Sequence, residues 1–353
     1  MVLFLVSSAS LAAPFAYITN YVGGGGSNTV TVIDVATNAI VSTIAVGSSP
    51  YGVAADPSGQ FVYVTNQAGN SVSVIDNASF TVVDTIAVGL SPIGVAVNAT
   101  ATRVYVANLG DNNVSVIDTA TNTVVATVPV GMTPSGVAVN AAGTRVYVTN
   151  RGADTISVID TATNTVSATI TVGFFPVGVA VNPAGTRAYV TNSGVNTVSV
   201  IDTALNAVIA TLPVANVPWN VTLNPAGTFV YVSLPGNDEV LVIDAATNAV
   251  VDTIIAGDGP YGVDVTPDGT TLYVAHSISG NVLAVDTTTN LVTATIPGVP
   301  NGAAFGEFIA PAAPAAVAAV PVPSLNLWGL ILLSGLMALA VLYTQRRSDS
   351  GRT

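Results

Sequence analysis

A tetrapeptide of the form Tyr-Val-Thr-Asn recurs seven times, and no other feature of this sequence restricts its fold as strongly. The copies begin at Tyr17, Tyr63, Tyr105, Tyr147, Tyr189, Tyr231 and Tyr273. They lie 42 residues apart, except for 46 between the first two, where the extra residues coincide with a run of four glycines. A second marker, the Asp of an Ile-Asp-like pair, recurs every 42 residues from Asp34 to Asp286. A fixed period of this length indicates that each copy is one supersecondary unit of a repeat architecture.

Each unit contains four short strands, as the copy at 176–212 illustrates. Its strands are GVAV at 178–181, RAYVT at 187–191, TVSVI at 197–201 and AVIATL at 207–212. They are rich in β-branched residues, and turn-forming Gly, Pro, Asn and Asp stand between them. A lone four-stranded sheet cannot bury both faces, but a ring of sheets can, because each packs between two neighbours. The repeat therefore predicts an all-β, seven-bladed β-propeller with four-stranded antiparallel blades over residues 15–309.

The two ends of the repeat region predict how the ring closes. The chain enters the repeat at a second strand, FAYITN, with no GVAV-like strand before it. Near the other end, residues 300–306 read PNGAAFG and resemble the missing innermost strand. We therefore expect residues 299–309 to complete the first blade. In this 3+1 closure, three strands come from the N-terminal side and one from the C-terminal side, and no sheet edge stays open.

Charge is scarce in this sequence and is strongly acidic where it occurs. Only 7% of the residues are charged, and the net charge is −12. Residues 15–309 contain 16 Asp and 2 Glu against 4 Arg, which gives −14. Such a surface repels phosphates, so we expect no nucleic-acid partner. The absence of cysteine excludes disulfides and thiolate metal sites.

The first residues resemble part of an export signal. Residues 1–14 combine a short apolar core with small residues, as in the back half of a secretory signal peptide. A basic start is missing, and the alternative is a buried first strand. We interpret the segment as the back half of a signal peptide that is truncated at its start.

The last residues have the composition of a membrane anchor. Residues 310–323 form a Pro/Ala-rich linker, which is semi-rigid and does not pack. The next segment, 325–343, is uncharged, and its 19 residues span about 28 Å as a helix, close to the thickness of a bilayer core. Arg346 and Arg347 follow. Since basic residues stay on the cytoplasmic side, we expect a transmembrane helix with residues 348–353 as a cytoplasmic tail.

The repeat resembles a known family. The seven tetrads, together with phrases such as GVAVNPAGTR, NTVSVID and TATNTVVAT, resemble the YVTN family of β-propeller repeats over about 295 residues. That resemblance implies an exported bacterial or archaeal protein of the surface-layer kind. The wider neighbourhood of the family includes lactonase-type propellers and propeller domains of redox enzymes.

The tail at 324–347, with the two residues before it, resembles an IPTL-type sorting signal. The residues that carry the resemblance are Val322, Pro323, Ser324, Leu325, Trp328, Gly329, Arg346 and Arg347. Val322 replaces Ile and Ser324 replaces Thr of that motif. The resemblance implies processing near Pro323 by an exosortase-type transpeptidase. It also implies at least transient anchoring through the C-terminal helix, in the cell envelope or at the surface of a Gram-negative bacterium.

Few residues qualify for catalysis. The seven repeated Asp residues suit Asx-type turns, because seven identical copies indicate a folding role. Arg103, Arg145 and Arg187 begin second strands in register and are expected to be solvated strand ends. His276 is the only histidine, so any imidazole-based mechanism depends on it alone. We therefore expect no cofactor, no metal site and no catalytic residues.

The best candidate for a ligand site is the part of the repeat that departs most from the consensus. Blades six and seven replace consensus residues with aromatic, acidic and imidazole side chains, at Trp219, Asn220, Asp238, Glu239, Asp258, Tyr261, Asp264 and His276. These positions are expected on one sector of one rim, where they suit a small polar ligand, a sugar or a cation. The alternative is simple divergence of a degenerate repeat.

The sequence favours a non-catalytic binding or structural module over an enzyme. We expect a monomeric, exported propeller with an unidentified surface ligand or protein partner. The alternative is a lactonase-like hydrolase with a site at the channel mouth near blades six and seven. A hydrolase needs clustered ionisable groups at one mouth of the channel, whereas a scaffold needs only a polar rim.

Overall fold

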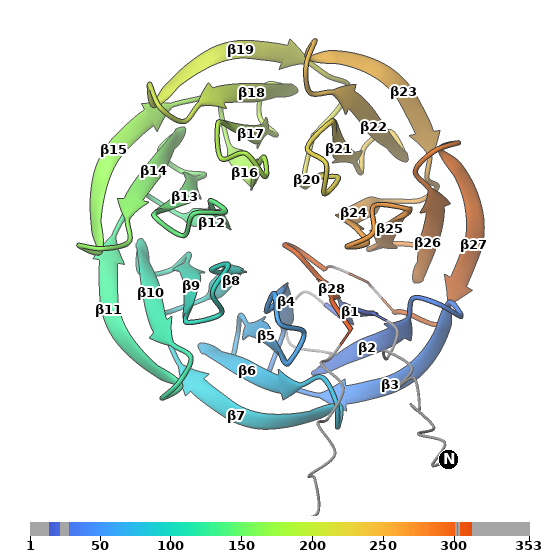
Figure 1. The fold of residues 1–353 in the computed structure, drawn as a ribbon, viewed down its shortest axis with the longest axis horizontal. Helices are drawn as coiled ribbons and strands as arrows, with labels where there is room; N and C mark the ends of the chain where they lie inside the picture. The colour runs from blue at the N-terminus through green and yellow to red at the C-terminus, as the bar shows by residue number, and fades with distance from the viewer. Residues whose placement is uncertain (1–13, 22–27, 301, 303, 313–353) are drawn as a thin grey trace, which may run out of the picture. The chain divides into compact units, whose positions relative to one another are not determined.

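The computed structural model describes residues 14–21, 28–300, 302 and 304–312, and these form a ring of seven four-stranded antiparallel sheets around a central channel (Figure 1). No helix occurs in the described part of the chain. Its elements are 28 strands, β1 to β28. The predicted all-β, seven-bladed propeller is therefore confirmed.

Every blade has an innermost, a second, a third and an outermost strand. The innermost strands of blades one to seven are β28 (Ile309–Ala310), β4 (Pro50–Ala55), β8 (Pro92–Val97), β12 (Pro134–Val139), β16 (Pro176–Val181), β20 (Val221–Leu223) and β24 (Pro260–Val265). The second strands are β1 (Phe15–Thr19), β5 (Phe61–Asn66), β9 (Arg103–Asn108), β13 (Arg145–Asn150), β17 (Arg187–Asn192), β21 (Phe229–Leu234) and β25 (Thr271–His276). The third strands are β2 (Thr29–Asp34), β6 (Ser71–Asp76), β10 (Asn113–Asp118), β14 (Thr155–Asp160), β18 (Thr197–Asp202), β22 (Glu239–Asp244) and β26 (Asn281–Asp286). The outermost strands are β3 (Ala39–Ala45), β7 (Thr81–Ala87), β11 (Thr123–Pro129), β15 (Thr165–Thr171), β19 (Ala207–Pro213), β23 (Ala249–Ile255) and β27 (Leu291–Pro297).

The ring closes through the C-terminal segment, as the 3+1 prediction requires. Strand β28 pairs antiparallel with β1, and the first blade has the order β28-β1-β2-β3. The regular pairing is shorter than expected, because Ile309 and Ala310 alone form the strand. Ahead of it, Gly302 makes a single bridge to Asn20. The chain then turns toward blade two, where the carbonyl oxygen of Phe305 accepts a hydrogen bond from the Val53 N–H at 3.0 Å.

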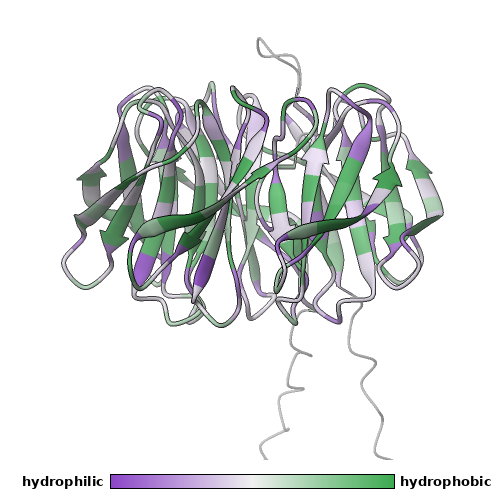
Figure 2. Cartoon of the chain, turned by 90° about the horizontal axis from the view of Figure 1, so that it is seen from above, coloured by the Kyte–Doolittle hydropathy of each residue, from purple (hydrophilic) through white to green (hydrophobic). Residues whose placement is uncertain are grey.

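The seven tetrad tyrosines form the cores between blades. All seven are at most 1% exposed. They pack with the valines and isoleucines of the second and third strands in clusters that span neighbouring blades. Figure 2 shows this apolar banding in the middle of the strands. Each blade buries both of its faces only because it has two neighbours.

The innermost strands approach one another so closely that one position requires glycine. A Cβ atom on Gly52 would lie 2.1 Å from the carbonyl oxygen of Ile93 in the next blade, and one on Gly94 would lie 2.0 Å from that of Ser135. The same position is Gly in blades two to five and in blade seven, but Asn220 in blade six. Blade six has the shortened innermost strand β20, which begins only after Asn220.

The tetrad threonines bind neighbouring blades to each other. The hydroxyl of Thr149 accepts a hydrogen bond from the Gly136 N–H of its own blade at 2.6 Å. It donates one to the Val177 carbonyl of the next blade at 2.8 Å. Equivalent bonds to the next blade occur at Thr19, Thr65, Thr191 and Ser233. The Thr of the tetrad is therefore a connection between blades.

The predictions for both ends of the chain fall outside the described residues. This applies to the signal peptide at 1–14 except Pro14, the linker beyond residue 312, the sorting signal and the helix at 325–343. Within the described residues, no helix has the length and hydropathy needed to cross a membrane. By its contacts the chain divides between residues 314 and 315, and the propeller belongs to the first part.

Candidate functional site: the central channel

The repeated aspartates are turn formers. The Oδ1 atom of Asp244 accepts hydrogen bonds from the N–H groups of Ala246 and Thr247, at 3.0 and 2.7 Å. These bonds lower the pKa of the Asp244 carboxyl. Equivalent bonds occur at Asp34, Asp76, Asp118, Asp160, Asp202 and Asp286. All seven carboxylates therefore stabilise the turn that follows the third strand.

The arginines in register are more than the expected solvated strand ends, because each has a structural partner. Arg145 donates a hydrogen bond to the Thr203 carbonyl of the next blade at 2.6 Å, and Arg187 donates one to the Ala245 carbonyl at 2.7 Å. Arg103 forms an ion pair with Asp118 in its own blade, at 2.6 Å. These side chains hold turns and blades together.

Two of the predicted site residues, His276 and Asp238, have structural contacts with backbone groups. His276 is 0% exposed. Its Nε2 lies 2.7 Å from the Ala256 carbonyl and its Nδ1 lies 3.3 Å from the Asn281 carbonyl. Burial lowers its pKa, which favours the neutral ring. Asp238 accepts a bond from the Gly259 N–H at 3.0 Å, as the residues at this register do in four other blades.

Two further predicted residues belong to an apolar plug near one mouth of the channel. The apolar plug consists of Tyr51, Ile93, Val177, Trp219, Tyr261 and Phe305, with one residue from each of six blades. The rings of Trp219 and Tyr261 lie 4.9 Å apart, and the hydroxyls of Tyr51 and Tyr261 are 2.6 Å apart. Burial raises the pKa of Tyr51 to about 12, so this hydroxyl pair stays protonated. The plug lies on the side of the loops that enter the innermost strands.

Asp264 lies further along the channel and anchors the closing segment. It is 6% exposed, and its Oδ2 accepts a hydrogen bond from the Ile309 N–H of β28 at 2.9 Å. This contact explains why blade seven has a carboxylate where four other blades have Ala. Burial raises the pKa of Asp264 well above its usual range, and the charge of Glu307 raises it further.

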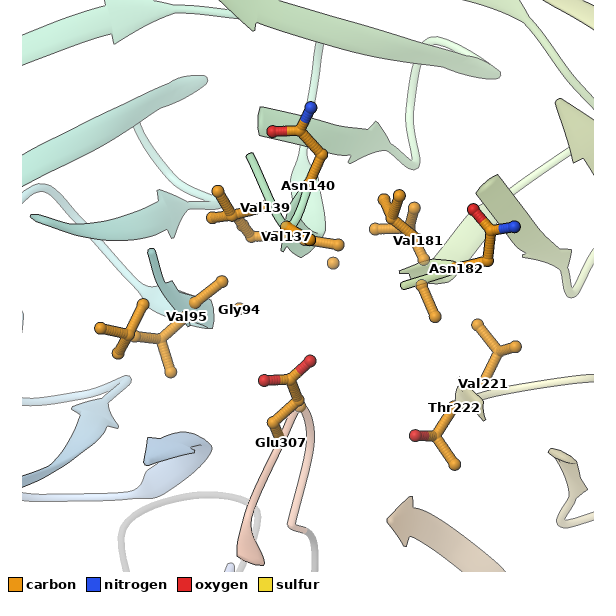
Figure 3. Close-up of a pocket in the computed structure, with 18 of the residues that line it drawn as sticks. Gly94, Val95, Val137, Val139, Asn140, Val181, Asn182, Val221, Thr222 and Glu307 are labelled. Carbon is orange, nitrogen blue, oxygen red and sulfur yellow. The ribbon is translucent and has the colours of Figure 1, made fainter. Parts of the chain in front are cut away.

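Glu307 was not among the predicted site residues, yet it is the carboxylate that occupies the channel. It comes from the closing segment and extends toward the innermost strands of the opposite blades (Figure 3). The side chain is exposed to the space of the channel, but protein surrounds that space, and this desolvation raises the pKa of its carboxyl. The Glu307 carbonyl is held by the Ala55 N–H at 3.1 Å.

The channel contains a cavity of about 260 Å³ below the apolar plug. Its wall is formed by valines and alanines of the innermost strands of blades three to six, and its polar lining is Asn140, Asn182, Asn220, Thr222 and Glu307. A second cavity of about 300 Å³ shares part of this lining and adds Asp56 and Asp264 near the proline-containing turns at the other end. Among the described residues, no group of three or more His, Cys, Asp or Glu side chains is arranged to hold a metal ion.

The eight predicted residues do not all meet at one rim. Trp219 and Tyr261 belong to the plug, and Asn220 and Asp264 line the channel below it. Glu239 begins β22 and is half-buried, while Asp258 is an exposed loop residue. Sequence reasoning missed Glu307 because it lies outside the repeat. The one available signal was an acidic residue within a segment expected to form an innermost strand.

Comparison with known proteins agrees with this fold. A family model described as a YNCE-like beta-propeller matches residues 96–187, and an IPTL-CTERM motif matches residues 320–347. The chain is a seven-bladed propeller in which residues 96–187 are similar to a YNCE-like beta-propeller and residues 320–347 carry an IPTL-CTERM motif. This combination fits an exported propeller held in the cell envelope.

Solved structures show the same fold at low sequence identity. A chain of Kuenenia stuttgartiensis hydrazine synthase is similar, with a TM-score of 0.69 and 23% identity, over 81% of this propeller protein and 99% of that chain. A functionally unknown protein from Desulfotomaculum acetoxidans has a TM-score of 0.70 and 16% identity, over 84% and 98%. At these identities the likeness concerns the fold alone. No curated protein matches the sequence.

Proposed function

We propose that this propeller is an exported, non-catalytic binding or structural module of the cell envelope. The observation that supports the proposal best is the state of its only histidine. His276 is fully buried, and both ring nitrogens face backbone carbonyls. Because the ring is buried and each nitrogen lies against a backbone carbonyl, neither nitrogen is accessible to a substrate or a metal ion.

The C-terminal motif supplies the route to the envelope. In this proposal, residues 325–343 hold the protein in the membrane, with Arg346 and Arg347 on the cytoplasmic side. An exosortase-type transpeptidase then processes the chain near Pro323. The expected linker begins after residue 310, because Ala310 belongs to β28. It separates the propeller from this anchor, and the propeller functions as a monomer. A Gram-negative host and the signal peptide at 1–14 belong to the same proposal.

Cell fractionation tests the localisation. The intact chain should appear in the envelope fraction or at the surface, and a variant that ends at residue 319 should be released into the soluble exported fraction. A variant that lacks only 348–353 is the matched control, because it keeps the motif and both arginines. Intact protein found free in the cytoplasm would contradict the proposal.

An activity screen tests the non-catalytic role against a lactonase-like hydrolase. The purified full chain should not turn over a panel of lactones and esters. The diagnostic variant is His276→Asn, since Asn occupies this tetrad position in five other blades and the fold accommodates it. Turnover by the wild type that His276→Asn abolishes would favour the hydrolase instead.

A further inference from the structure

The cavity below the apolar plug has an apolar wall and a single charged group. Valines of β8, β12 and β16 line it, as does Val221 of β20. Glu307 is the only charged side chain in its lining. A wall of this kind binds the hydrocarbon part of a small molecule, while a few convergent polar groups fix its orientation. The cavity therefore suits a ligand with an apolar body and a polar end.

The carboxylate in this cavity has no cationic partner among the described residues. The one ion pair found there joins Arg103 to Asp118, outside the channel. The nearby carboxyl of Asp264 accepts a hydrogen bond from the Ile309 N–H and supplies no counter-charge either. A carboxylate surrounded by protein and without a counter-charge is costly. A cation is therefore the ligand charge that this cavity favours.

Asn220 supplies an independent sign of a ligand. It is 4% exposed and lines the same cavity, and its Nδ2 atom is buried without a hydrogen-bond partner. Its Oδ1 already accepts the Val221 N–H at 2.9 Å, so the unused group is the donor. Five other blades have Gly at this register, so the amide is specific to blade six. An unsatisfied buried donor costs about 1–3 kcal/mol, and a rotation of the Asn220 side chain that brings Nδ2 to an acceptor oxygen of a ligand in the cavity would remove that cost.

We propose that the channel cavity binds a small organic cation, namely a primary amine with a branched aliphatic body and a hydroxyl or carbonyl oxygen. The ammonium group pairs with Glu307, the oxygen accepts from the Asn220 amide, and the hydrocarbon packs on the valines. Entry is from the end opposite the apolar plug. This inference rests on the proposed binding role and names its ligand class.

The test uses three probes of similar shape. Leucinol carries the amine and the hydroxyl, 3-methylbutylamine carries only the amine, and 4-methylpentan-1-ol carries only the hydroxyl. Binding to the purified full chain in non-ionic detergent is measured by titration calorimetry. We expect leucinol to bind most tightly. The probe without an amine, 4-methylpentan-1-ol, should bind at least about tenfold more weakly, which corresponds to a loss of about 1.4 kcal/mol.

Three variants connect the binding to the named groups. Glu307→Gln keeps the shape of the side chain and removes its charge. It should weaken the binding of both amine probes at least about tenfold, since a hydrogen bond to a charged group contributes about 1.5–3 kcal/mol. Asn220→Gly restores the residue found in five other blades. It should lower the affinity for leucinol to that for 3-methylbutylamine. Glu239→Gln removes a carboxylate outside the cavity and should change nothing. Circular dichroism of each variant establishes that it is folded.

The contrary outcomes are distinct. Absence of heat with leucinol up to about 10 mM, a range that covers weak binding, would overturn the inference. Equal affinity of leucinol for the folded Glu307→Gln variant and the wild type would do so as well. Envelope localisation without amine binding would refute this inference and leave the proposed function intact, whereas hydrolytic turnover would refute the non-catalytic role.

Discussion

The tetrad threonine permits a sharp test of how the blades are held together. Near Gly136 the pairing of β12 with β13 is interrupted, because the register shifts between Pro134 and Val137. The Gly136 N–H therefore bonds to the Thr149 hydroxyl, which also bonds to the Val177 carbonyl of the next blade. Thr149 is 0% exposed, so water cannot replace it. Thr149→Val removes the hydroxyl and keeps the shape.

The expected cost follows from the two backbone groups that lose a partner. Each buried, unsatisfied donor or acceptor costs about 1–3 kcal/mol, so Thr149→Val should lower the free energy of unfolding by about 2–6 kcal/mol. Thr149→Ser keeps the hydroxyl and should recover most of this loss. The chain contains a reciprocal case in blade three, where the buried Ala107 occupies the Thr position of the tetrad. Ala107→Thr should add stability, because its hydroxyl would reach the Gly94 N–H and the Ser135 carbonyl.

Urea unfolding provides the measurement. Trp219 lies in the apolar plug and reports loss of the ring through its fluorescence. The four proteins, wild type, Thr149→Val, Thr149→Ser and Ala107→Thr, are compared at one pH and protein concentration. A Thr149→Val variant within about 0.5 kcal/mol of the wild type, the range of ordinary surface substitutions, would refute the reasoning.

Three further outcomes are expected. Phe308→Ala, in the closing segment and 0% exposed, should lower the free energy of unfolding by about 3–5 kcal/mol in the same urea assay; an unchanged value would mean that the segment does not close the ring. The pKa values of Asp264 and Glu307 are raised in the fold, so their contribution to stability should fall as pH rises above about 4 toward those values; the lowered pKa of His276 acts in the opposite direction below about 6.5, so the fall is measured as the difference between wild type and Asp264→Asn in urea titrations from pH 5 to 8, and a difference that does not change with pH would contradict it. Fluorescence anisotropy should show no DNA binding at physiological salt, given −14 over residues 15–309, and sub-micromolar, salt-sensitive binding would contradict this.

The sequence predicted the blades well because each local signal occurs seven times. The turn after the third strand has an Asp in every copy, and the core between blades has a Tyr in every copy. Short-range chemistry and burial thus point to the same element boundaries in each repeat. Ring closure was predictable for a related reason, since the missing strand of the first blade left a vacancy that only the C-terminal segment could fill.

The candidate site was less predictable because departure from a repeat has several physical causes. His276 departs from the tetrad Asn and fills the same buried place, and Asp264 departs from Ala because the closing segment beside it offers the Ile309 N–H. Trp219 is larger than the residues of most other blades at this register, and so are Tyr51 and Tyr261, because all three pack in the apolar plug. The sequence alone does not distinguish among these substitutions. The hydrogen bonds and packing seen in the structure show which side chains have a structural role and which are free to bind a ligand.

The residues that remain available share an origin at the break in the sevenfold symmetry. Seven identical inner strands would produce a symmetric channel lined by valine and alanine, with nothing to orient a ligand. Two changes alter this: the closing segment brings Glu307, and blade six brings Asn220 in place of Gly. Because a carboxylate lies on one side of the channel and an amide on another, the channel can bind a ligand in one preferred orientation. Any specific recognition by this propeller therefore depends on the residues where the repeat fails.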